Sequence, residues 1–214
     1  MAITGLKIGV SSAALAAFLV AQPVWADTET RPVAPFHAIS FAGSWDVDIT
    51  VGRPQSVVIE GDKDSIAHVK TEVVDGELRV GIEHSLVGFD RGGKLSAHVT
   101  VPSLDGFTRS GSGGATLSGI DGAKLALASN GSGMLKAEGH AADLALAVNG
   151  TGSADLADLK SDDAAVTING SGDAVVQVAH TLKAAINGSG RINYVGEPQV
   201  TSAIHGSGLI EKRS

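Results

Sequence analysis

Hydrophobic and polar positions alternate one by one through the second half of this chain. In Leu144-Ala145-Leu146-Ala147-Val148, large aliphatic side chains occupy every second position and small side chains lie between them. Similar segments recur at residues 125–129, 164–168, 182–186 and 200–204. A period of two is typical of a β-strand with one buried face, and the high glycine content disfavours helices. The pattern predicts short strands that bury their aliphatic side.

Six tetrapeptides of similar sequence separate these strands. They are Ser110-Gly111-Ser112-Gly113, Asn130-Gly131-Ser132-Gly133, Asn149-Gly150-Thr151-Gly152, Asn169-Gly170-Ser171-Gly172, Asn187-Gly188-Ser189-Gly190 and His205-Gly206-Ser207-Gly208. Their first residues follow one another after 20, 19, 20, 18 and 18 positions. Asn tolerates the left-handed backbone region and Gly enters it freely, so each tetrapeptide is expected to form a corner between two strands.

A fixed period of this length is typical of a solenoid, in which each repeat forms one coil. We therefore expect an all-β fold, a single-stranded parallel β-helix with about 18–20 residues per coil. A more variable third side would close each coil through segments such as 139–143 and 196–198. Equivalent strands of successive coils would stack about 4.8 Å apart, which places like residues above one another.

Stacking of the coils predicts two columns of candidate site residues. The first is a structural ladder at the corners, where side-chain amides hydrogen-bond along the stack. Its members are Ser110, Asn130, Asn149, Asn169, Asn187 and His205. The second is a smooth outward face that could bind a ligand or another surface. Its members are Ala126, Ala128, Ala145, Ala147, Ala165, Thr167, Ala185 and Ala203.

The region from residue 36 to 109 has no clean tetrapeptide but remains rich in strand patterns. Residues 69–74, the turn Asp75-Gly76 and residues 78–82 are typical of a hairpin or a tight corner. Two interpretations stay open for this region: irregular first coils of the same solenoid, which we favour, or a small sheet that caps it. A cap would protect the exposed strand edge of the stack.

The first 26 residues have the pattern of an export signal. Lys7 precedes the apolar run 8–20, and Val24-Trp25-Ala26 is a small-residue cleavage pattern. The alternative is an uncleaved anchor, although the run is short for a membrane span. We assign residues 1–26 to a signal peptide, 27–35 to a linker and 36–214 to the solenoid domain, with irregular coils or a cap at 36–109 and regular coils at 110–214.

Charge and composition narrow the function classes. The formal net charge of −7 becomes −8 when Lys7 is removed with the signal, and basic runs are absent from the sequence. Such a chain is a poor candidate for binding nucleic acid. It contains no cysteine, so disulfides and thiolate metal sites are excluded. No second apolar segment is long enough to span a bilayer once the signal is cleaved.

Several segments together resemble a known family. They are residues 36–49, Val57-Val58-Ile59-Glu60-Gly61-Asp62, Asp75-Gly76-Glu77-Leu78, Val101-Pro102-Ser103-Leu104 and the Gly-Ser-Gly repeats. This combination looks like the putative auto-transporter adhesin, head GIN domain family, over roughly residues 36–211. The resemblance implies an exported bacterial protein with a right-handed parallel β-helix. The family is essentially of unknown function, so the resemblance supplies no mechanism.

No sequence motif indicates catalysis or a cofactor. The pairs Asp155/Asp158 and Asp162/Asp163 could serve acid–base chemistry on an acidic polysaccharide, but they occupy outward positions. The seven histidines form no metal-ligand spacing, although His68, His84 and His98 could cluster. We expect no catalytic, cofactor or metal site.

The predicted function is an exported, non-enzymatic β-solenoid with a structural or adhesive role in the periplasm or at the cell surface. Its expected partner is a surface glycan or an envelope protein, and the chain is expected to be a monomer or to self-associate weakly. The alternatives are an enzyme that processes acidic glycans and a self-assembling envelope scaffold. Charges at Glu211, Lys212 and Arg213 would discourage edge-to-edge stacking of the last coil.

Overall fold

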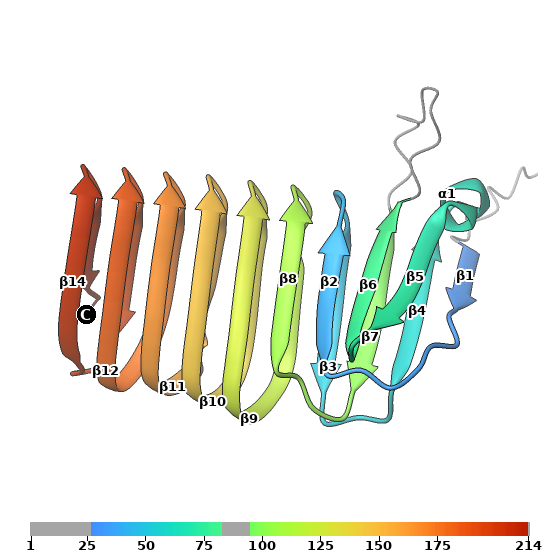
Figure 1. Cartoon of the computed structure of the whole chain (residues 1–214), viewed down its shortest axis with the longest axis horizontal. Coiled ribbons are helices and arrows are strands. Elements are labelled where there is room, and N and C mark those ends of the chain that lie inside the picture. Colours follow the sequence, from blue (N-terminus) through green and yellow to red (C-terminus); the bar gives the residue numbers. More distant parts are fainter. Residues whose placement is uncertain (1–26, 83–94, 214) are drawn as a thin grey trace, which may run out of the picture.

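The computed structural model describes residues 27–82 and 95–213, and over these it forms a β-solenoid of about five turns. The coils follow one another along a straight axis, with the first described residues at one end and the last at the other (Figure 1). The predicted β-solenoid fold is therefore confirmed. The predicted signal peptide, residues 1–26, lies outside the described residues.

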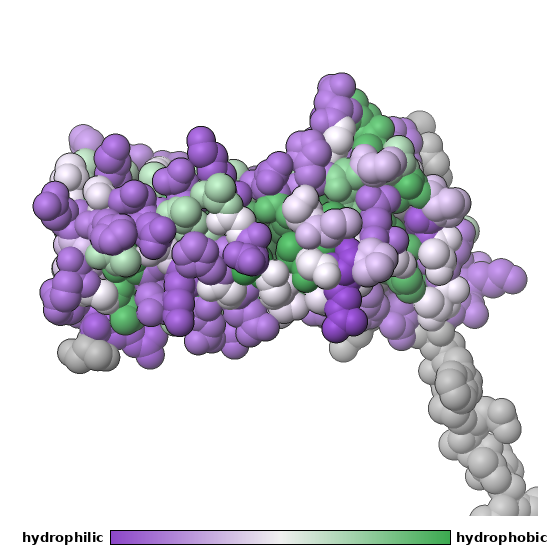
Figure 2. Space-filling view, turned by 90° about the horizontal axis from the view of Figure 1, so that it is seen from below, coloured by the Kyte–Doolittle hydropathy of each residue, from purple (hydrophilic) through white to green (hydrophobic). Residues whose placement is uncertain are grey.

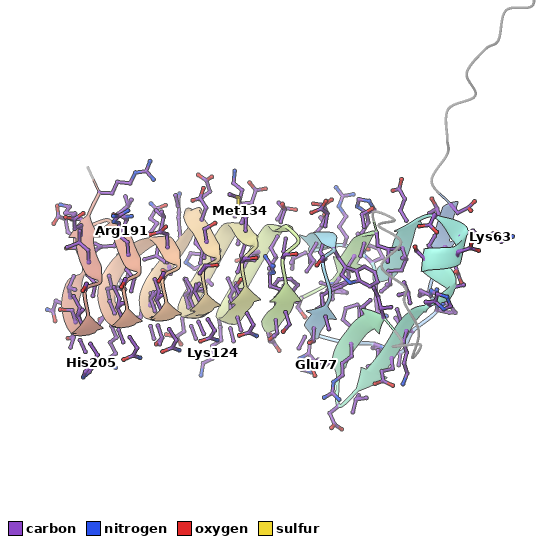
Figure 3. The ribbon with its side chains drawn as sticks, turned by 90° about the horizontal axis from the view of Figure 1, so that it is seen from above. Lys63, Glu77, Lys124, Met134, Arg191 and His205 are labelled. Atoms are coloured by element: carbon purple, nitrogen blue, oxygen red, sulfur yellow. The ribbon has the colours of Figure 1, made fainter. Side chains whose placement is uncertain are left out.

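Four long, bent strands form the regular coils: β9 (Ala115–Gly131), β10 (Met134–Gly150), β11 (Ser153–Gly170) and β12 (Asp173–Gly188). The first part of β9 pairs with β3, whereas its last part pairs with β8. Each long strand thus passes from one layer of the solenoid to the other. Figure 3 shows the two layers from above, with Met134 and Arg191 on one outer face and Lys124 and His205 on the other.

The expected third side of the coil is not a separate element. Parallel pairing continues around the bend of β10, where Gly139 faces Leu159 and Asp143 faces Asp163. Gly139 makes the bend possible with a φ of 130°, a conformation open to glycine. The coil is therefore two layers joined by a bend on one edge and by the glycine corner on the other.

Both layers continue beyond the long strands. The first layer contains, in order, β1 (Asp27–Thr30), β4 (Ser56–Gly61), β7 (Ser96–Val101), β3 (Asp46–Val51), the first parts of β9–β12, β13 (Arg191–Val195) and β15 (Leu209–Lys212). The second layer contains β5 (Val69–Val74), β6 (Glu77–Ile82), β2 (Ala38–Ala42), β8 (Gly106–Gly111), the last parts of β9–β12 and β14 (Gln199–Gly206).

The N-terminal region combines coil-like and antiparallel strands. Strands β2, β3, β6, β7 and β8 make parallel pairs like those of the regular coils, whereas β1, β4 and β5 pair antiparallel. The predicted hairpin is confirmed as β5 and β6, joined by Asp75 (φ 52°) and Gly76 (φ 78°). Antiparallel strands end both layers here, so the region stacks like coils and also closes the stack.

Two N-terminal segments differ from what the sequence led us to expect. We place residues 27–35 in a linker, but Asp27–Thr30 form β1 and pair antiparallel with β4. A short helix that the alternation pattern does not reveal, α1 (Lys63–Ala67), covers the end of the first layer. Asp62 caps α1 by accepting a hydrogen bond from the Ser65 backbone N–H, and hydrogen bonds from Ser65 lower the pKa of the Asp62 carboxyl.

The core is a column of aliphatic side chains between the two layers. Parallel register places Val148, Ile168 and Ile186 above one another, and all three are fully buried. Arg109 interrupts this column, because it fills the equivalent inward position of β8. Its guanidinium donates to the carbonyl oxygen of Gly111 at 2.7 Å, and burial lowers its pKa.

Candidate functional site

The predicted smooth face lies on the outside of the second layer. One row of outward positions runs across the strands through Gly106, Ala126, Ala145, Ala165, Lys183 and Thr201. A second row runs through Thr108, Ala128, Ala147, Thr167, Ala185 and Ala203. The structure thus brings all eight predicted face residues onto one outer surface. Their side chains are short, so a ligand could approach the sheet closely.

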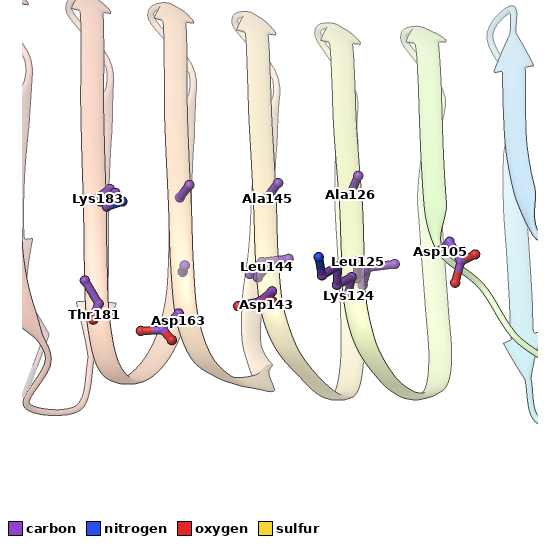
Figure 4. A pocket seen from close by; sticks show the side chains of 12 residues that line it. Asp105, Lys124, Leu125, Ala126, Asp143, Leu144, Ala145, Asp163, Thr181 and Lys183 are labelled. Carbon is purple, nitrogen blue, oxygen red and sulfur yellow. The ribbon is translucent and has the colours of Figure 1, made fainter.

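A shallow hollow of about 600 Å³ lies on this face. Its floor includes Ala126, Ala145 and Ala165, and its borders include Lys124, Asp143, Asp163 and other residues with longer side chains (Figure 4). The long side chains around small ones create the depression, because the strands beneath them are continuous. The hollow is open to solvent and runs across several coils, which suits an extended ligand better than a small molecule.

Charged side chains along the hollow were missed by sequence reasoning. Parallel register aligns Lys124, Asp143, Asp163 and Thr181 in one row, with Asp105 at its N-terminal end. Figure 4 shows this row beside the row of alanines. Period-two alternation contains the signal, because Lys124, Asp143 and Asp163 each stand two positions before an alanine of the first row. The face therefore offers carboxylate acceptors and ammonium donors beside small apolar side chains.

The corner column forms a continuous hydrogen-bonded ladder of side-chain amides. Asn149 Nδ2 donates to Asn130 Oδ1 at 2.7 Å, and Asn169 Nδ2 donates to Asn149 Oδ1 at 2.7 Å. Asn187 repeats the contact with Asn169 at 2.8 Å, and Asn130 reaches Ser110 Oγ at 3.4 Å. His205 follows Asn187 in the register. These amides hydrogen-bond to one another, which assigns the ladder a role in coil stacking.

The corner glycines bring successive backbones into close contact. Gly170 has a φ of 130°, and a Cβ atom added to it would lie 2.3 Å from the carbonyl oxygen of Gly150. The same carbonyl accepts a hydrogen bond from the Ser171 backbone N–H at 2.9 Å. The corner edge is therefore a stack of glycine backbone with polar side chains outside it.

The paired carboxylates do not gather in the hollow. Of the four, only Asp163 lines it. Asp155 accepts a hydrogen bond from the Ala157 backbone N–H at 3.3 Å, and Asp162 lies 4.0 Å from His140 Nε2. Asp158 is exposed near the bend. The pairs are thus divided between the bend and the hollow.

The three histidines that could cluster, His68, His84 and His98, are only partly within the described residues. His98 lies on the outer face of the first layer, with Nδ1 3.4 Å from Asp48 Oδ2 and Nε2 3.5 Å from Glu60 Oε2. His84 lies outside the described residues. Within residues 27–82 and 95–213, no group of three or more His, Asp and Glu side chains could hold a metal ion.

The edge of the molecule along the bends is mostly hydrophilic. Figure 2 shows this edge from below, with apolar side chains in small patches that are larger towards the N-terminal part. The described part of the chain contains no helix with the length and apolar character needed to cross a bilayer.

Comparison with known proteins identifies a family. The model of the family described as "putative auto-transporter adhesin, head GIN domain" matches residues 35–198, most of the chain. No curated protein gives a significant match.

Solved structures share the fold at low sequence identity. A putative adhesin from Bacteroides fragilis is 23% identical, with a TM-score of 0.71 over 88% of this chain and 97% of its own. A putative adhesin from Parabacteroides merdae is 20% identical, with a TM-score of 0.58 over 90% and 98%. A putative lipid binding protein from Parabacteroides distasonis is 19% identical, with a TM-score of 0.56 over 90% and 98%. These likenesses establish a common fold.

Proposed function

This chain belongs to the putative auto-transporter adhesin, head GIN domain family, and on that basis we propose that it is an exported adhesive module without enzymatic activity. The proposed ligand is an extended surface glycan or a segment of an envelope protein. The proposed location is the periplasm or the cell surface, where a family of adhesins would act.

The observation that carries the proposal is the regular outer face of the second layer. Rows of alanine, threonine and glycine leave its centre accessible, and the flat rings of a linear glycan could lie on the methyl groups of Ala126, Ala145 and Ala165. The neighbouring charges supply hydrogen-bonding partners for hydroxyl groups, with Asp143 accepting and Lys124 donating. Because the rows repeat at the strand spacing, the face suits a ligand that is itself repetitive.

The carboxylate pairs that the sequence suggests for catalysis do not converge in the hollow. Catalysis by paired carboxylates needs two groups that converge on one bond of the substrate. Here Asp155 lies on the first part of β11, whereas Asp163 lines the hollow on the second part of the same strand. Of the four carboxylates in these pairs, a polysaccharide lying in the hollow would contact Asp163 alone, beside Asp143 of the neighbouring coil.

Binding of the purified protein to a glycan array and to whole bacterial cells tests the proposal. We expect Ala145→Arg to weaken binding at least tenfold, because the long side chain would fill the hollow and separate the ligand from the sheet. The matched control is Thr116→Arg, which adds the same charge at an exposed position on the opposite layer and should bind like the wild type.

The experiment tests two claims separately: that the protein binds glycans or cells, and that it binds them through the outer face of the second layer. Failure of the wild-type protein to bind any glycan or cell would contradict the adhesive proposal. Equal loss of binding in both variants would show that the second layer is not the binding face. Circular dichroism and thermal unfolding of each variant establish that a loss of binding does not reflect a loss of fold.

A further inference from the structure

The C-terminal end of the solenoid leaves core positions uncovered. Strand β14 pairs with β12 on one side only, and no other described strand pairs with it. Its inward side chains Val200 and Ile204 are 39% and 43% exposed, whereas Leu182 and Ile186, one coil earlier, are fully buried. Ile210 of β15 is only partly buried, whereas Ile192, the residue aligned with it one coil earlier, is fully buried. The last coil therefore presents the apolar interior of the stack to solvent.

The opposite end of the same stack is closed. Helix α1 packs against β1 and β4 there, and its Ile66 is 4% exposed. The final strands of both layers carry charges on their edges, with Asp27 and Glu29 in β1 and Lys70 and Glu72 in β5. Charges on edge strands are a common means of preventing further pairing. This end is built against the addition of another strand.

Strand β14 has none of these protections. Its eight residues, Gln-Val-Thr-Ser-Ala-Ile-His-Gly, contain no Asp, Glu, Lys, Arg or Pro. An edge strand of this length without charge or proline is open to pairing with another chain. An uncharged edge and exposed core side chains occur together at this end, and together they indicate an interface.

We propose that the C-terminal end binds a second copy of this chain, with β14 of the two copies antiparallel about a two-fold axis. With Ser202 opposite its own counterpart, Val200 of each copy lies opposite Ile204 of the other, and both pairs face the joined core. On the outer side, Thr201 lies opposite Ala203, so no like charges meet. The strand is self-complementary in this register, as an isologous interface requires.

The chain already uses antiparallel strands to close these two layers. Strand β4 pairs antiparallel with β7 in the first layer, and β5 pairs antiparallel with β6 in the second. An axis normal to the layers also brings β15 beside its counterpart, where Ile210, which aligns with the buried Ile192, adds apolar contact. Lys212 follows Val176 and Tyr194 in the register, and its ammonium group is paired with Glu197 of the same chain.

Because only the C-terminal end of the described chain has an open strand edge, the chain should form a dimer and not a filament. Growth of a filament needs an open edge at both ends of each molecule, but the charged β1 and β5 occupy the N-terminal end. Pairing through β14 uses the open end of both copies. The product is therefore a closed dimer, not the self-assembling scaffold that is the alternative from sequence. Its two smooth faces remain free, so this proposal stands apart from the adhesive role.

Light scattering and sedimentation over a range of protein concentrations measure the assembly. We expect the wild type to be a dimer and Ile204→Lys to raise the dimer dissociation constant at least tenfold, because an ammonium group would be buried in the joined core. The matched control is Met134→Lys, which introduces the same charge at an apolar residue that is 57% exposed and far from β14. This variant should remain dimeric. A monomeric wild type, filaments, or equal dissociation of both variants would overturn the proposal.

Cross-linking tests the register. The natural chain contains no cysteine, so each introduced thiol is the only one present. Under mild oxidation, Ser202→Cys should form a disulfide-linked dimer, because the two thiols face each other at the axis. Gln199→Cys serves as the control, since its counterpart would lie six residues away along the paired strands and beyond disulfide reach. Absence of cross-linking at Ser202→Cys, or equal cross-linking at both positions, would overturn the antiparallel arrangement.

Discussion

Glycine at the corners allows successive coils to approach until their backbones touch. At Gly170, two separate requirements exclude a side chain: the positive φ and the 2.3 Å approach that a Cβ atom would make to Gly150. Gly52 has a positive φ of 83° as well, but a Cβ atom there would meet nothing within 4 Å. Comparison of these two positions separates backbone strain from steric contact.

We expect Gly170→Ala to lower the free energy of unfolding by about 3 kcal/mol, because strain and overpacking add. Gly52→Ala should cost about 1 kcal/mol, since strain acts there alone. Urea unfolding followed by circular dichroism measures both values. Equal costs would contradict the conclusion that coil-to-coil contact selects glycine at the corner.

The asparagine ladder links the coils by side chains as well as by backbone. Asn149 both donates to Asn130 and accepts from Asn169. Asn149→Ala should therefore lower the free energy of unfolding by about 1–2 kcal/mol, since it removes two hydrogen bonds. The control is His205→Ala at the exposed end of the column, which should change stability by less than about 0.5 kcal/mol. A larger effect of the His205 variant would contradict the ladder.

A core side chain is fully buried only when neighbouring coils cover it on both sides. Ile168 and Ile204 occupy the same position in different coils, but Ile168 is fully buried and Ile204 is 43% exposed. Ile168→Ala should cost about 3–4 kcal/mol because it leaves a cavity in the core. In dilute solution, where the chain would be monomeric, Ile204→Ala should cost less than about 1 kcal/mol. Thermal unfolding of both variants measures the difference.

Alternation predicts which side chains of a coil point inward but not how the coil closes. Leu144, Leu146 and Val148 are buried as the period of two requires. The chain stays paired through the bend at Gly139. The alternation pattern does not predict this pairing, because it depends on the neighbouring coil and not on the local sequence. Strand β1 was missed for a similar reason: its sequence Asp-Thr-Glu-Thr has no apolar side, and backbone pairing with β4 holds it.

The candidate face could be predicted in part. Repetition alone identifies the alanine rows, because every coil contributes the same position. The hollow depends on which side chains border those rows, and that required the register that aligns Asp143 with Lys124 and Asp163. Exposure of Val200 and Ile204 was also invisible in the sequence, since their pattern matches that of buried coils and only the absence of a following described strand distinguishes them.

At the scale of the whole molecule, stability should vary along the axis. Coils in the middle have two neighbours, whereas β14 and β15 pair on one side only. Backbone amides of β14 should therefore exchange with deuterium fastest among the coil strands, and those of β10 and β11 slowest. Mass spectrometry of peptides from dilute protein measures this gradient. Uniform protection along the stack would show that the solenoid opens as a single unit.

The described chain begins at one end of the rod and finishes at the other, and the hydrogen bonds between coils run along the rod's length (Figure 1). A mechanical pull between the two termini is therefore directed along those bonds. The coil boundaries lie in series, so each carries the whole load and the weakest boundary separates first. If the chain is held at its N-terminus, a ligand bound to the smooth face near the closed end would load the coils between them and leave the coils beyond it unloaded. The force that the bound protein withstands would then depend on which coil binds the ligand.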